Sequence, residues 1–426
     1  MKRLLWTIGM LLALQCVRGA APYRTQALSG HIRSVQIYNY QRTPYLPVIE
    51  LGSSDRITLT FDDLATTPST YSYRFVHCRS DWTPDDLMES DYIDGFPQGY
   101  IDQYAFSMNT YFSYTHYEKT FPDEGTGFRL SGNYVLLAFA EEQPETPVLS
   151  ACFSVVEQRI VIRSKVSALT DAGYQRGFQQ VSLELDHAGY DIQRPDTELD
   201  VQVFQNGRCD NAARRVQPDY TAGQTLLYKH DRQLVFEAGN TFRVFDISSP
   251  YVLGDRVESI DYHAPYYHVT LYPDEIRDGK TYSHQRDVAG RYQVHRQYSE
   301  DPGTESDYYF THFTLPMELP MTDGDVYLMG ELTGYRLDEQ ARMEYNPMTM
   351  AYEKTLLLKQ GGYNYLYVFV PKGAVMGSPR PIEGNRWETG NEYTLYVYHR
   401  PFGSKYDRLI GFDVVYADQR YEKPGF

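Results

Sequence analysis

The sequence has few cysteines, few tryptophans and no long apolar segment after its first residues. It contains four cysteines and three tryptophans among 426 residues. No CxxC pair occurs, which excludes a structural zinc site of the usual spacing. No apolar run after residue 14 reaches the roughly 18 residues that a membrane-spanning helix needs. We therefore expect neither a zinc-stabilised fold nor a helical membrane domain.

Basic residues are also scarce. Lysine and arginine total 40 against 56 aspartates and glutamates, which gives a formal net charge of −16. This balance argues against a broad basic face for nucleic acid or anionic lipid.

With 42% hydrophobic and 23% charged residues, the composition is that of a globular protein. The length predicts two to four domains at roughly 100–200 residues each.

Signatures of catalysis are missing from the sequence. It has no HExxH, no GxSxG and no dinucleotide-binding fingerprint. The Gly-Lys-Thr segment 279–281 lacks the earlier glycine of a P-loop, because Asp274 stands there. His77 and Cys78 are neighbours in a strand-like run, so their side chains point to opposite faces and the imidazole cannot activate the thiol. We expect no enzymatic activity.

One cluster of acidic residues is a candidate calcium-binding site. Its members are Asp85, Asp86, Glu89, Asp91 and Asp94. Calcium loops need convergent oxygens and a turn glycine at a set spacing, which this cluster lacks. We interpret the cluster as a solvated face, and we expect no metal ion and no other cofactor.

The amino terminus has the pattern of a secretory signal peptide. Lys2 and Arg3 precede an apolar run over residues 4–14, and Val17 and Gly19 provide permissive residues at the −3 and −1 positions. This pattern predicts a signal peptide over residues 1–19, with Ala20 as the mature terminus. Lipidation at Cys16 is an alternative, although Gln15 occupies the position where a lipobox needs a small residue. Both interpretations predict an exported protein.

Tyrosine is the residue present in excess. The chain has 40 tyrosines, and aromatic residues make up 15% of it. Apolar residues alternate with polar ones along much of the sequence, as in Ile57, Leu59 and Phe61; Tyr71, Tyr73 and Phe75; Val181, Leu183 and Leu185; and Tyr363, Tyr365 and Tyr367. Such runs, bounded by Gly, Pro, Asn and Asp, predict half-buried antiparallel strands. Helical periodicity is confined to a short candidate at residues 84–89.

The pattern predicts an all-β protein of serial immunoglobulin-like or E-set β-sandwich domains with few short helices. We place an N-terminal β-sandwich domain at residues 20–158 and a second one at 159–310. A C-terminal E-set-like domain follows at 311–426. The Asn206-Gly207 dipeptide predicts a hairpin turn between the strand at 201–204 and the next segment, because Asn-Gly suits the two positive φ angles of a type I′ turn.

Several longer strings point to a family. They are Pro47-Val-Ile-Glu-Leu-Gly52, Leu59-Thr-Phe-Asp-Asp-Leu64, Tyr71-Ser-Tyr-Arg-Phe-Val-His-Cys78, Tyr92-Ile-Asp-Gly-Phe96, Leu130-Ser-Gly-Asn-Tyr134 and Tyr396-Val-Tyr-His-Arg-Pro-Phe-Gly403. In their order and spacing they closely resemble the plug protein family of the type IX secretion system, formerly a family of unknown function. The resemblance spans nearly the whole mature chain.

The resemblance implies a periplasmic protein at the inner face of the outer membrane. There it binds the translocon barrel of the type IX system and occludes it, so that it is peripheral to the membrane through its partner and does not span it. No contact with nucleic acid is implied. An exported glycan-binding β-sandwich protein is the alternative, since tyrosine-rich sandwiches often bind sugars through aromatic platforms.

Seven residues of the family-like strings and the loops beside them are expected to be structural. They are His77, Cys78, Asp81, Trp82, Asn109, His116 and Tyr117. We expect four of these, namely His77, Asp81, Trp82 and Asn109, to form a buried polar network that holds a long loop against the sheet. A disulfide between Cys78 and Cys152 is possible in an oxidising compartment. The alternative is that both are small buried apolar residues.

Overall fold

A computed structural model of the chain describes residues 22–42, 46–65, 67–171, 177–249 and 251–417. The predicted signal peptide, Ala20 and Cys16 lie outside the described residues. The rest is built almost entirely of strands, so the prediction of an all-β protein is confirmed. In this part of the chain no helix is both long and apolar enough to span a membrane.

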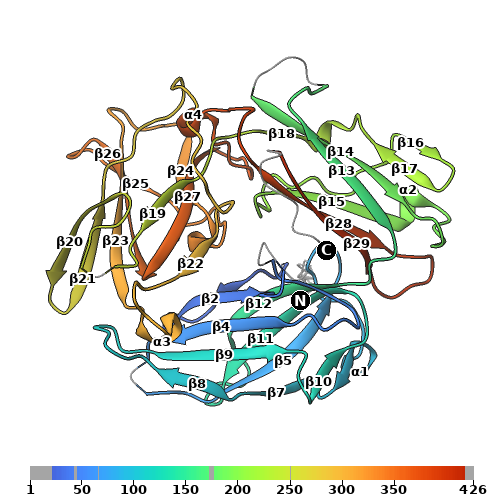
Figure 1. The fold of residues 1–426 in the computed structure, drawn as a ribbon, viewed down its shortest axis with the longest axis horizontal. Helices are drawn as coiled ribbons and strands as arrows, with labels where there is room; N and C mark the ends of the chain where they lie inside the picture. The colour runs from blue at the N-terminus through green and yellow to red at the C-terminus, as the bar shows by residue number, and fades with distance from the viewer. Residues whose placement is uncertain (1–21, 43–45, 66, 172–176, 250, 418–426) are drawn as a thin grey trace, which may run out of the picture.

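Lobe 1, residues 22–157, is a sandwich of two main sheets at the bottom of Figure 1. One sheet has the order β1-β12-β11-β5-β7 with β3 beside β12, and the other has the order β2-β4-β9-β8. The elements are β1 (Gln26–Ala27), β2 (Ile32–Tyr38), β3 (Val48–Glu50), β4 (Ile57–Asp63), β5 (Tyr71–Cys78), α1 (Glu89–Tyr92), β6 (Ile93–Gly95), β7 (Gln98–Ile101), β8 (Gln103–Phe106), β9 (Thr115–Phe121), β10 (Thr126–Phe128), β11 (Gly132–Ala140) and β12 (Pro147–Val156).

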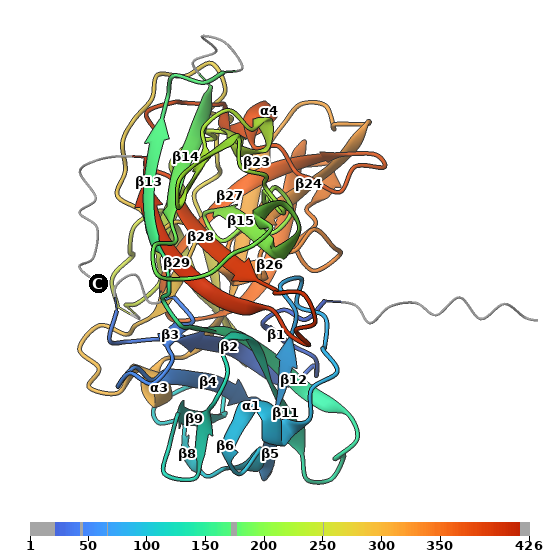
Figure 2. The ribbon, with the colours of Figure 1, turned by 90° about the vertical axis from the view of Figure 1, so that its right-hand side faces the viewer.

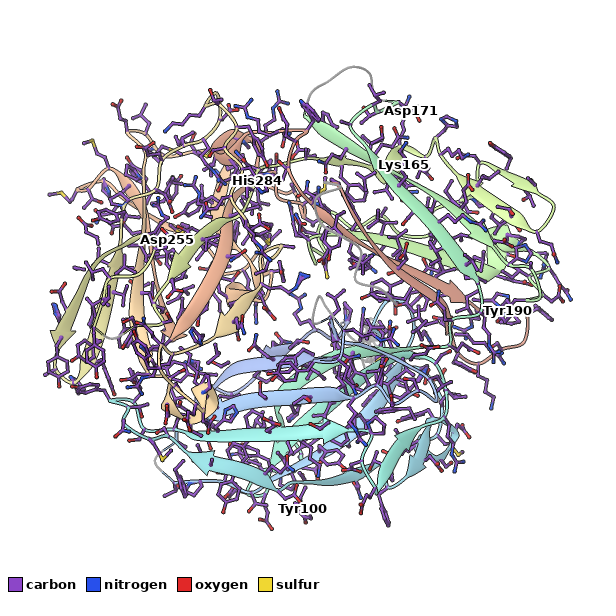
Figure 3. The ribbon with its side chains drawn as sticks, in the orientation of Figure 1. Tyr100, Lys165, Asp171, Tyr190, Asp255 and His284 are labelled. Atoms are coloured by element: carbon purple, nitrogen blue, oxygen red, sulfur yellow. The ribbon has the colours of Figure 1, made fainter. Side chains whose placement is uncertain are left out.

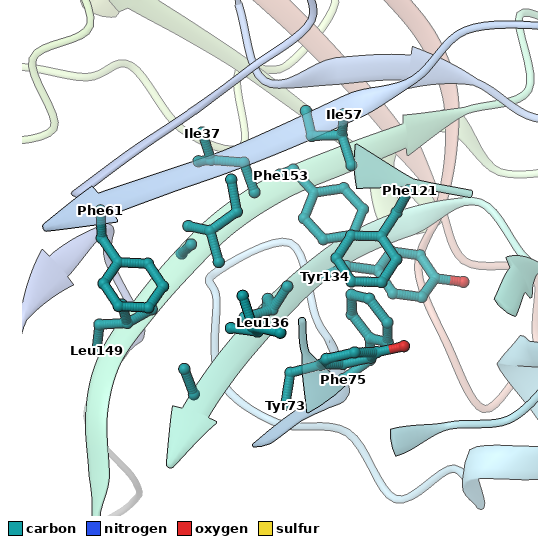
Figure 4. Close-up of a cluster of buried hydrophobic side chains, with 14 of the residues drawn as sticks. Ile37, Ile57, Phe61, Tyr73, Phe75, Phe121, Tyr134, Leu136, Leu149 and Phe153 are labelled. Carbon is teal, nitrogen blue, oxygen red and sulfur yellow. The ribbon is translucent and has the colours of Figure 1, made fainter. Parts of the chain in front are cut away.

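Strand β4 has the predicted alternation of apolar and polar side chains, but it is buried on both faces and not half-buried as expected. Ile57, Leu59 and Phe61 are fully buried in the core between the two sheets, which Figure 4 shows with Phe75, Phe121, Tyr134 and Phe153. Because successive side chains of a strand point to opposite faces, Thr60 and Asp62 turn away from this core. They face the centre of the molecule instead.

Lobe 2 combines residues 158–238 with residues 386–417. Its elements are β13 (Val161–Ser167), β14 (Phe178–Asp186), α2 (Pro195–Glu198), β15 (Leu199–Gln205), β16 (Tyr220–Ala222), β17 (Thr225–Tyr228), η1 (Arg232–Leu234), β18 (Val235–Glu237), β28 (Glu392–His399) and β29 (Arg408–Tyr416). One sheet has the order β13-β14-β17-β16 with β18 beside β14, and the other has the order β15-β28-β29. A single buried cluster joins Val181 and Leu183 of the first sheet to Leu395 and Val397 of the second.

Lobe 3, residues 239–385, lies between the two parts of lobe 2 in the sequence. Its elements are β19 (Arg243–Asp246), β20 (Val257–His263), β21 (Tyr266–Leu271), β22 (Tyr292–Val294), α3 (Pro302–Glu305), β23 (Tyr308–Pro316), β24 (Gly324–Met329), η2 (Glu331–Thr333), β25 (Glu344–Asn346), β26 (Ala351–Lys359), β27 (Gly361–Pro371) and α4 (Arg380–Glu383). The sheet β20-β21-β23-β26-β25 packs on a four-stranded sheet of order β19-β27-β22, in which β24 also pairs with the long strand β27.

These cores divide the chain differently from the serial domains that we expected. The gap between β12 and β13 spans the predicted boundary at 158, but the predicted boundary at 310 falls inside β23. Strands β28 and β29, expected in the third domain, belong to the core of lobe 2. Strand β15 pairs with β28, which lies far from it in the sequence. The alternation of apolar residues within a strand does not predict which distant strand it pairs with. An immunoglobulin-like or E-set topology stays a prediction.

Two local predictions can be compared directly. Asn206 and Gly207 both have the predicted positive φ angles, 51° and 71°, and the N–H of Arg208 donates to the carbonyl of Gln205 across the turn. The predicted hairpin is wrong, because β15 pairs with β28, and the segment after the turn meets β15 in an isolated bridge between Val203 and Ala213. The predicted helix at residues 84–89 lies further along the chain, as α1 at Glu89–Tyr92. Asp85, inside the predicted helix, instead accepts a hydrogen bond from the backbone N–H of Leu87, which favours a turn.

The three lobes are arranged around a common centre. Figure 1 shows lobe 1 below, lobe 3 on the left and lobe 2 on the upper right, and Figure 2 shows the same body from the side. In Figure 3, side chains from all three lobes project toward that centre.

Candidate functional site

The three lobes enclose a central cavity of about 1690 Å³. Lobe 1 contributes Tyr38, Asp62, His116 and Glu118; lobe 2 contributes Phe204, Glu392 and Tyr396; and lobe 3 contributes Arg291, Tyr335 and Lys359. A cavity lined in this way exists only while the lobes keep their relative positions. The contacts between lobes therefore determine its shape.

Lobes 1 and 3 are joined by a buried ion pair. Lys359 Nζ lies 2.6 Å from Asp62 Oδ2, and both side chains are only 1% exposed. Tyr308 donates a hydrogen bond of 2.6 Å to the same carboxylate oxygen, and His116 Nδ1 lies 2.6 Å from the other one. Burial on its own raises the pKa of Asp62, but Lys359 and His116 outweigh it and lower that pKa below the ordinary value. Burial lowers the pKa of Lys359, and Asp62 opposes this effect.

A second contact between these lobes holds a loop of lobe 1. The buried carboxylate of Asp307 accepts hydrogen bonds from the backbone N–H groups of Tyr111, at 2.8 Å, and Phe112, at 3.0 Å. Burial raises the pKa of Asp307, although these N–H groups oppose the shift. The ring of Phe112 stacks on Tyr266 of β21 with centroids 3.9 Å apart. Polar and aromatic contacts together fix the loop on lobe 3.

Lobes 2 and 3 meet at Glu392. Arg291 Nη2 lies 2.6 Å from Glu392 Oε2, and Tyr416 donates a 3.1 Å hydrogen bond to the same oxygen. Burial on its own lowers the pKa of the Arg291 guanidinium. The carboxylate of Glu392 outweighs this effect and raises that pKa above its ordinary value. Nearby, Arg208 donates a hydrogen bond of 2.6 Å to the carbonyl of Gly377. The ion pair lies on the cavity wall.

Lobes 1 and 2 are joined through the turn after β5. Ser80 donates its hydroxyl to Asp200 and its backbone N–H to Asp407, each at 2.8 Å. Tyr398 donates a 2.9 Å hydrogen bond to the side-chain oxygen of Asn133. Each pair of lobes thus shares buried polar contacts, which lose their partners if the lobes separate. Because unpaired buried polar groups are costly, these contacts oppose separation of the lobes.

The predicted network around His77 is only partly present. His77 is buried, its Nδ1 contacts Asp85, and its Nε2 lies 3.1 Å from the carbonyl oxygen of Ser131. The predicted partner Asp81 instead accepts hydrogen bonds from Thr83. The sequence analysis missed Asp85 because it belongs to the acidic cluster interpreted as solvated, yet its side chain is 1% exposed.

The other members of the predicted network lie apart from His77. Trp82 is half-buried and packs against the cluster that contains Cys78 and Cys152. Asn109 is exposed, with a φ of 57°, in the loop that contacts lobe 3. The prediction that Asn109 belongs to this network is wrong, because its loop extends toward Thr304, whose carbonyl accepts the N–H of Met108.

His116 and Tyr117 have separate structural roles on β9. His116 faces the central cavity and contacts Asp62, whereas Tyr117 is buried in the core of lobe 1. The Tyr117 hydroxyl donates a 2.7 Å hydrogen bond to the carbonyl of Ser69, and its ring stacks on Phe61 with centroids 4.9 Å apart. Adjacent residues on one strand therefore serve the joint between lobes and the core.

The two buried cysteines are not bridged. Cys78 and Cys152 are both free and buried, on β5 and β12. Strand β11 runs between them, with Asn133 opposite Cys78 and Val135 opposite Cys152. Two strand spacings separate their backbones by about 9–10 Å, whereas a disulfide needs Cα atoms within about 7 Å. The alternative interpretation, two small buried residues, describes them. Cys209 is free and exposed.

The acidic cluster does not converge. Asp94 forms an ion pair with Arg129 at 2.7 Å, and Asp86 lies 3.3 Å from Arg79. Among the residues that the structure describes, no group of three or more His, Cys, Asp or Glu side chains is arranged to hold a metal ion. Burial raises the pKa of the Cys78 and Cys152 thiols, which disfavours their reactive thiolate forms. The site offers surfaces for binding, and neither Cys78 nor Cys152 is an activated nucleophile.

Comparisons with known proteins give the family. Residues 32–157 match the model of the type 9 secretion system plug protein first domain. A crystal structure of a hypothetical protein from Parabacteroides merdae is 40% identical, with a TM-score of 0.91, over 93% of this chain and 100% of that chain.

Other comparisons add nothing to this assignment. An alkylpurine DNA glycosylase from Pseudomonas fluorescens, bound to DNA containing an abasic site analog, is 20% identical over 29% of each chain. Its TM-score of 0.18 carries no argument, and no curated protein matches. The family model covers nearly all of lobe 1, and the family and the structural neighbour together suggest a non-catalytic protein. The chain belongs to the type IX secretion system plug protein family.

Proposed function

We propose that this protein is a periplasmic plug that binds the outer-membrane translocon of the type IX secretion system and occludes its channel. The family match over lobe 1 is the observation that carries the proposal. The buried polar contacts between all three pairs of lobes support it, because a cover over a wide pore must keep its shape.

The surface also suits reversible binding. A plug has to leave when cargo passes, so its interface should be polar-rimmed and wet, unlike a permanent hydrophobic core. Exposed tyrosines such as Tyr100, Tyr104 and Tyr262, each more than half exposed, offer large contact areas with few rotatable bonds and a hydroxyl that tolerates water. The net charge of −16 steers the protein toward a basic rim on its partner.

On this proposal the function is occlusion by binding, and no turnover is needed. The protein lies in the periplasm at the inner face of the outer membrane and is held there by its partner. The proposal requires neither a cofactor nor a contact with nucleic acid.

A reconstituted channel tests the proposal. Purified translocon is inserted into a planar bilayer, and the purified protein is added to its periplasmic side. We expect the ionic current to fall in a saturable way and to recover at high salt, because surface charge attraction is screened by ions. An exported acidic β protein from another system serves as the control and should leave the current unchanged. A translocon current that is insensitive to the protein at every concentration would contradict the proposal.

A further inference from the structure

Two successive strands of lobe 1 form an uncovered edge on the outer side of the molecule. Strand β7 closes one sheet beside β5, and β8 closes the other beside β9. Only Asp102 separates them, so residues 98–106 form an almost continuous extended segment. Figure 1 shows both strands along the bottom of lobe 1, and Figure 3 labels Tyr100 there, away from the central cavity.

Half of the backbone groups in this segment point away from the sheets. Phe75 N donates to Pro97 O, and Ser107 N donates to Tyr114 O, which fixes the alternation of bonded pairs in the two ladders. By that alternation, the backbone groups of Gln98 and Tyr100 in β7 point outward. The same holds for Tyr104 and Phe106 in β8. In the described chain no other backbone group bonds to this outer side.

The segment lacks the usual protection of sheet edges. Edges are commonly blunted by lysine, proline, bulges or short length. Strand β13 carries Arg163 and Lys165, β2 and β20 contain register shifts, and β16 and β25 have three residues each. Residues 98–106 contain no lysine, arginine or proline, and the one charge, Asp102, forms an ion pair with Lys119. Strands β7 and β8 have four residues each, but they follow one another along the chain, so together they present a longer edge than either strand alone. Such an edge is a template for another strand.

A pocket of about 350 Å³ lies at the start of this edge. It is lined by Tyr73, Phe96, Gln98, Gly99, Asp123, Glu124, Gly125 and Thr126. Phe96 is 71% exposed, Glu124 is also exposed, and Asp123 lies 3.4 Å from Lys119. Asp123 is therefore already neutralised by Lys119, and Glu124 is the carboxylate that faces an incoming cation. An aromatic ring beside this carboxylate suits a lysine or arginine side chain, through cation–π and ionic contacts.

We propose that residues 98–106 bind an extended segment of a partner protein by strand addition, with a basic side chain of that segment seated between Phe96 and Glu124. The exposed row of N–H and C=O groups can exchange water for a complementary row of backbone groups, which a polypeptide strand supplies and a glycan does not. The exposed rings of Tyr100, Tyr104 and Phe106 flank the added strand. The identity of the partner rests on the proposed function, because on that proposal the translocon carries the segment.

The test has an arm that does not depend on the translocon. The probe is a short synthetic peptide of alternating valine and threonine with an arginine at one end, and its binding to the full chain is followed by fluorescence anisotropy. We expect Tyr100→Lys and Tyr104→Lys to weaken binding about tenfold or more, because a lysine on the edge opposes pairing. The matched control Tyr220→Lys, on the β16 edge of lobe 2, should change binding less than about twofold, since it lies outside the site.

The pocket is tested separately. Glu124→Lys should weaken binding of the arginine peptide about tenfold and reverse the preference, so that a peptide ending in glutamate binds better. Glu142→Lys, another exposed acidic residue of lobe 1, is the control. Hydrogen exchange should show new protection at the amides of Gln98, Tyr100, Tyr104 and Phe106 in the complex. Unchanged melting temperatures establish that the variants are folded.

The second arm repeats the measurements with purified translocon. Wild type that binds the peptide at the edge but not the translocon would contradict the proposed function and leave the strand-addition site standing. Wild type that binds the translocon with equal affinity in both lysine variants would overturn strand addition and leave the plug function intact. Sedimentation showing a wild-type dimer that the lysine variants abolish would assign the edge to a second copy of this chain and overturn the proposed partner.

Discussion

Asp62 of β4 and Lys359 of β26, 297 positions apart in the chain, form an ion pair of 2.6 Å that is almost completely buried. It joins the lobe that carries the plug domain to lobe 3 and forms part of the cavity wall. The carboxylate also accepts from Tyr308, and the ammonium also donates to the carbonyl of Gly303 at 2.6 Å. Removing either charge leaves the other buried without its partner.

Lys359→Met should therefore destabilise the folded protein by about 3–5 kcal/mol, the usual effect of breaking a buried pair. Chemical denaturation measures this change. Lys229→Met is the matched control: Lys229 pairs with Glu184 at 3.0 Å and both side chains are 38% exposed, so the loss should be about 1 kcal/mol or less. Equal effects of the two substitutions would contradict the importance of the buried joint.

The same joint predicts a dependence on acid. Because the folded-state pKa of Asp62 is lowered, its stabilisation is present above the unfolded value of about 4 and is lost as pH falls through the lower folded value. Wild type should therefore lose more stability than Asp62→Asn between about pH 5 and pH 2. Denaturation midpoints of the two proteins across this range measure the difference. Parallel curves would show that Asp62 does not contribute in this way.

Trp82 should matter for folding. Its ring packs on the cluster of Cys78, Val135 and Cys152, and its carbonyl accepts the N–H of Tyr23. Because the ring is only half-buried, Trp82→Ala should cost about 2 kcal/mol, less than the 3–5 kcal/mol of a fully buried tryptophan. Trp387→Ala, at a residue 45% exposed, is the control. A stable Trp82 variant that no longer binds the translocon would identify an interface residue instead.

Thiol labelling tests the cysteine arrangement. In the native protein Cys209 should react with a thiol reagent, whereas Cys78 and Cys152 should react only after unfolding. Desolvation raises the pKa of all three thiols and so lowers the fraction of reactive thiolate in each. The expected difference therefore rests on the exposure of Cys209. Mass spectrometry of peptides prepared without reductant measures this, and a peptide pair linked through Cys78 and Cys152 would contradict the structure.

The predictable parts of this molecule are local. The alternation of Ile57, Leu59 and Phe61 correctly identified β4 and its core-facing side chains, because a strand shows a period of two in the sequence. The expectation of a half-buried strand is wrong for β4, since Thr58, Thr60 and Asp62 on its other face are buried too. The same strand places Asp62 at the joint, but nothing near residue 62 indicates that Lys359 is its partner. The pairing of β15 with β28 was missed for the same reason. For Asp85 the local sequence was misleading. This residue was expected to be solvated because it lies in an acidic run, yet its side chain is buried against His77.

The family was predicted from the resemblance of longer strings, because the alternation of apolar residues indicates strands and not a family. Strings such as those containing His77 and Tyr134 identify the family from the sequence alone, and lobe 1 contains the matched domain. The central cavity has no counterpart in the sequence pattern, because all three lobes contribute to its wall.

The most direct test of the plug function compares two deletions. Deleting this protein should make the outer membrane permeable to large solutes that it normally excludes, such as vancomycin, while the translocon remains in place. Deleting the translocon as well should abolish that additional leak, because no open channel is left to occlude. A leak that persists in the double deletion would contradict the account and show that the protein supports the envelope in another way.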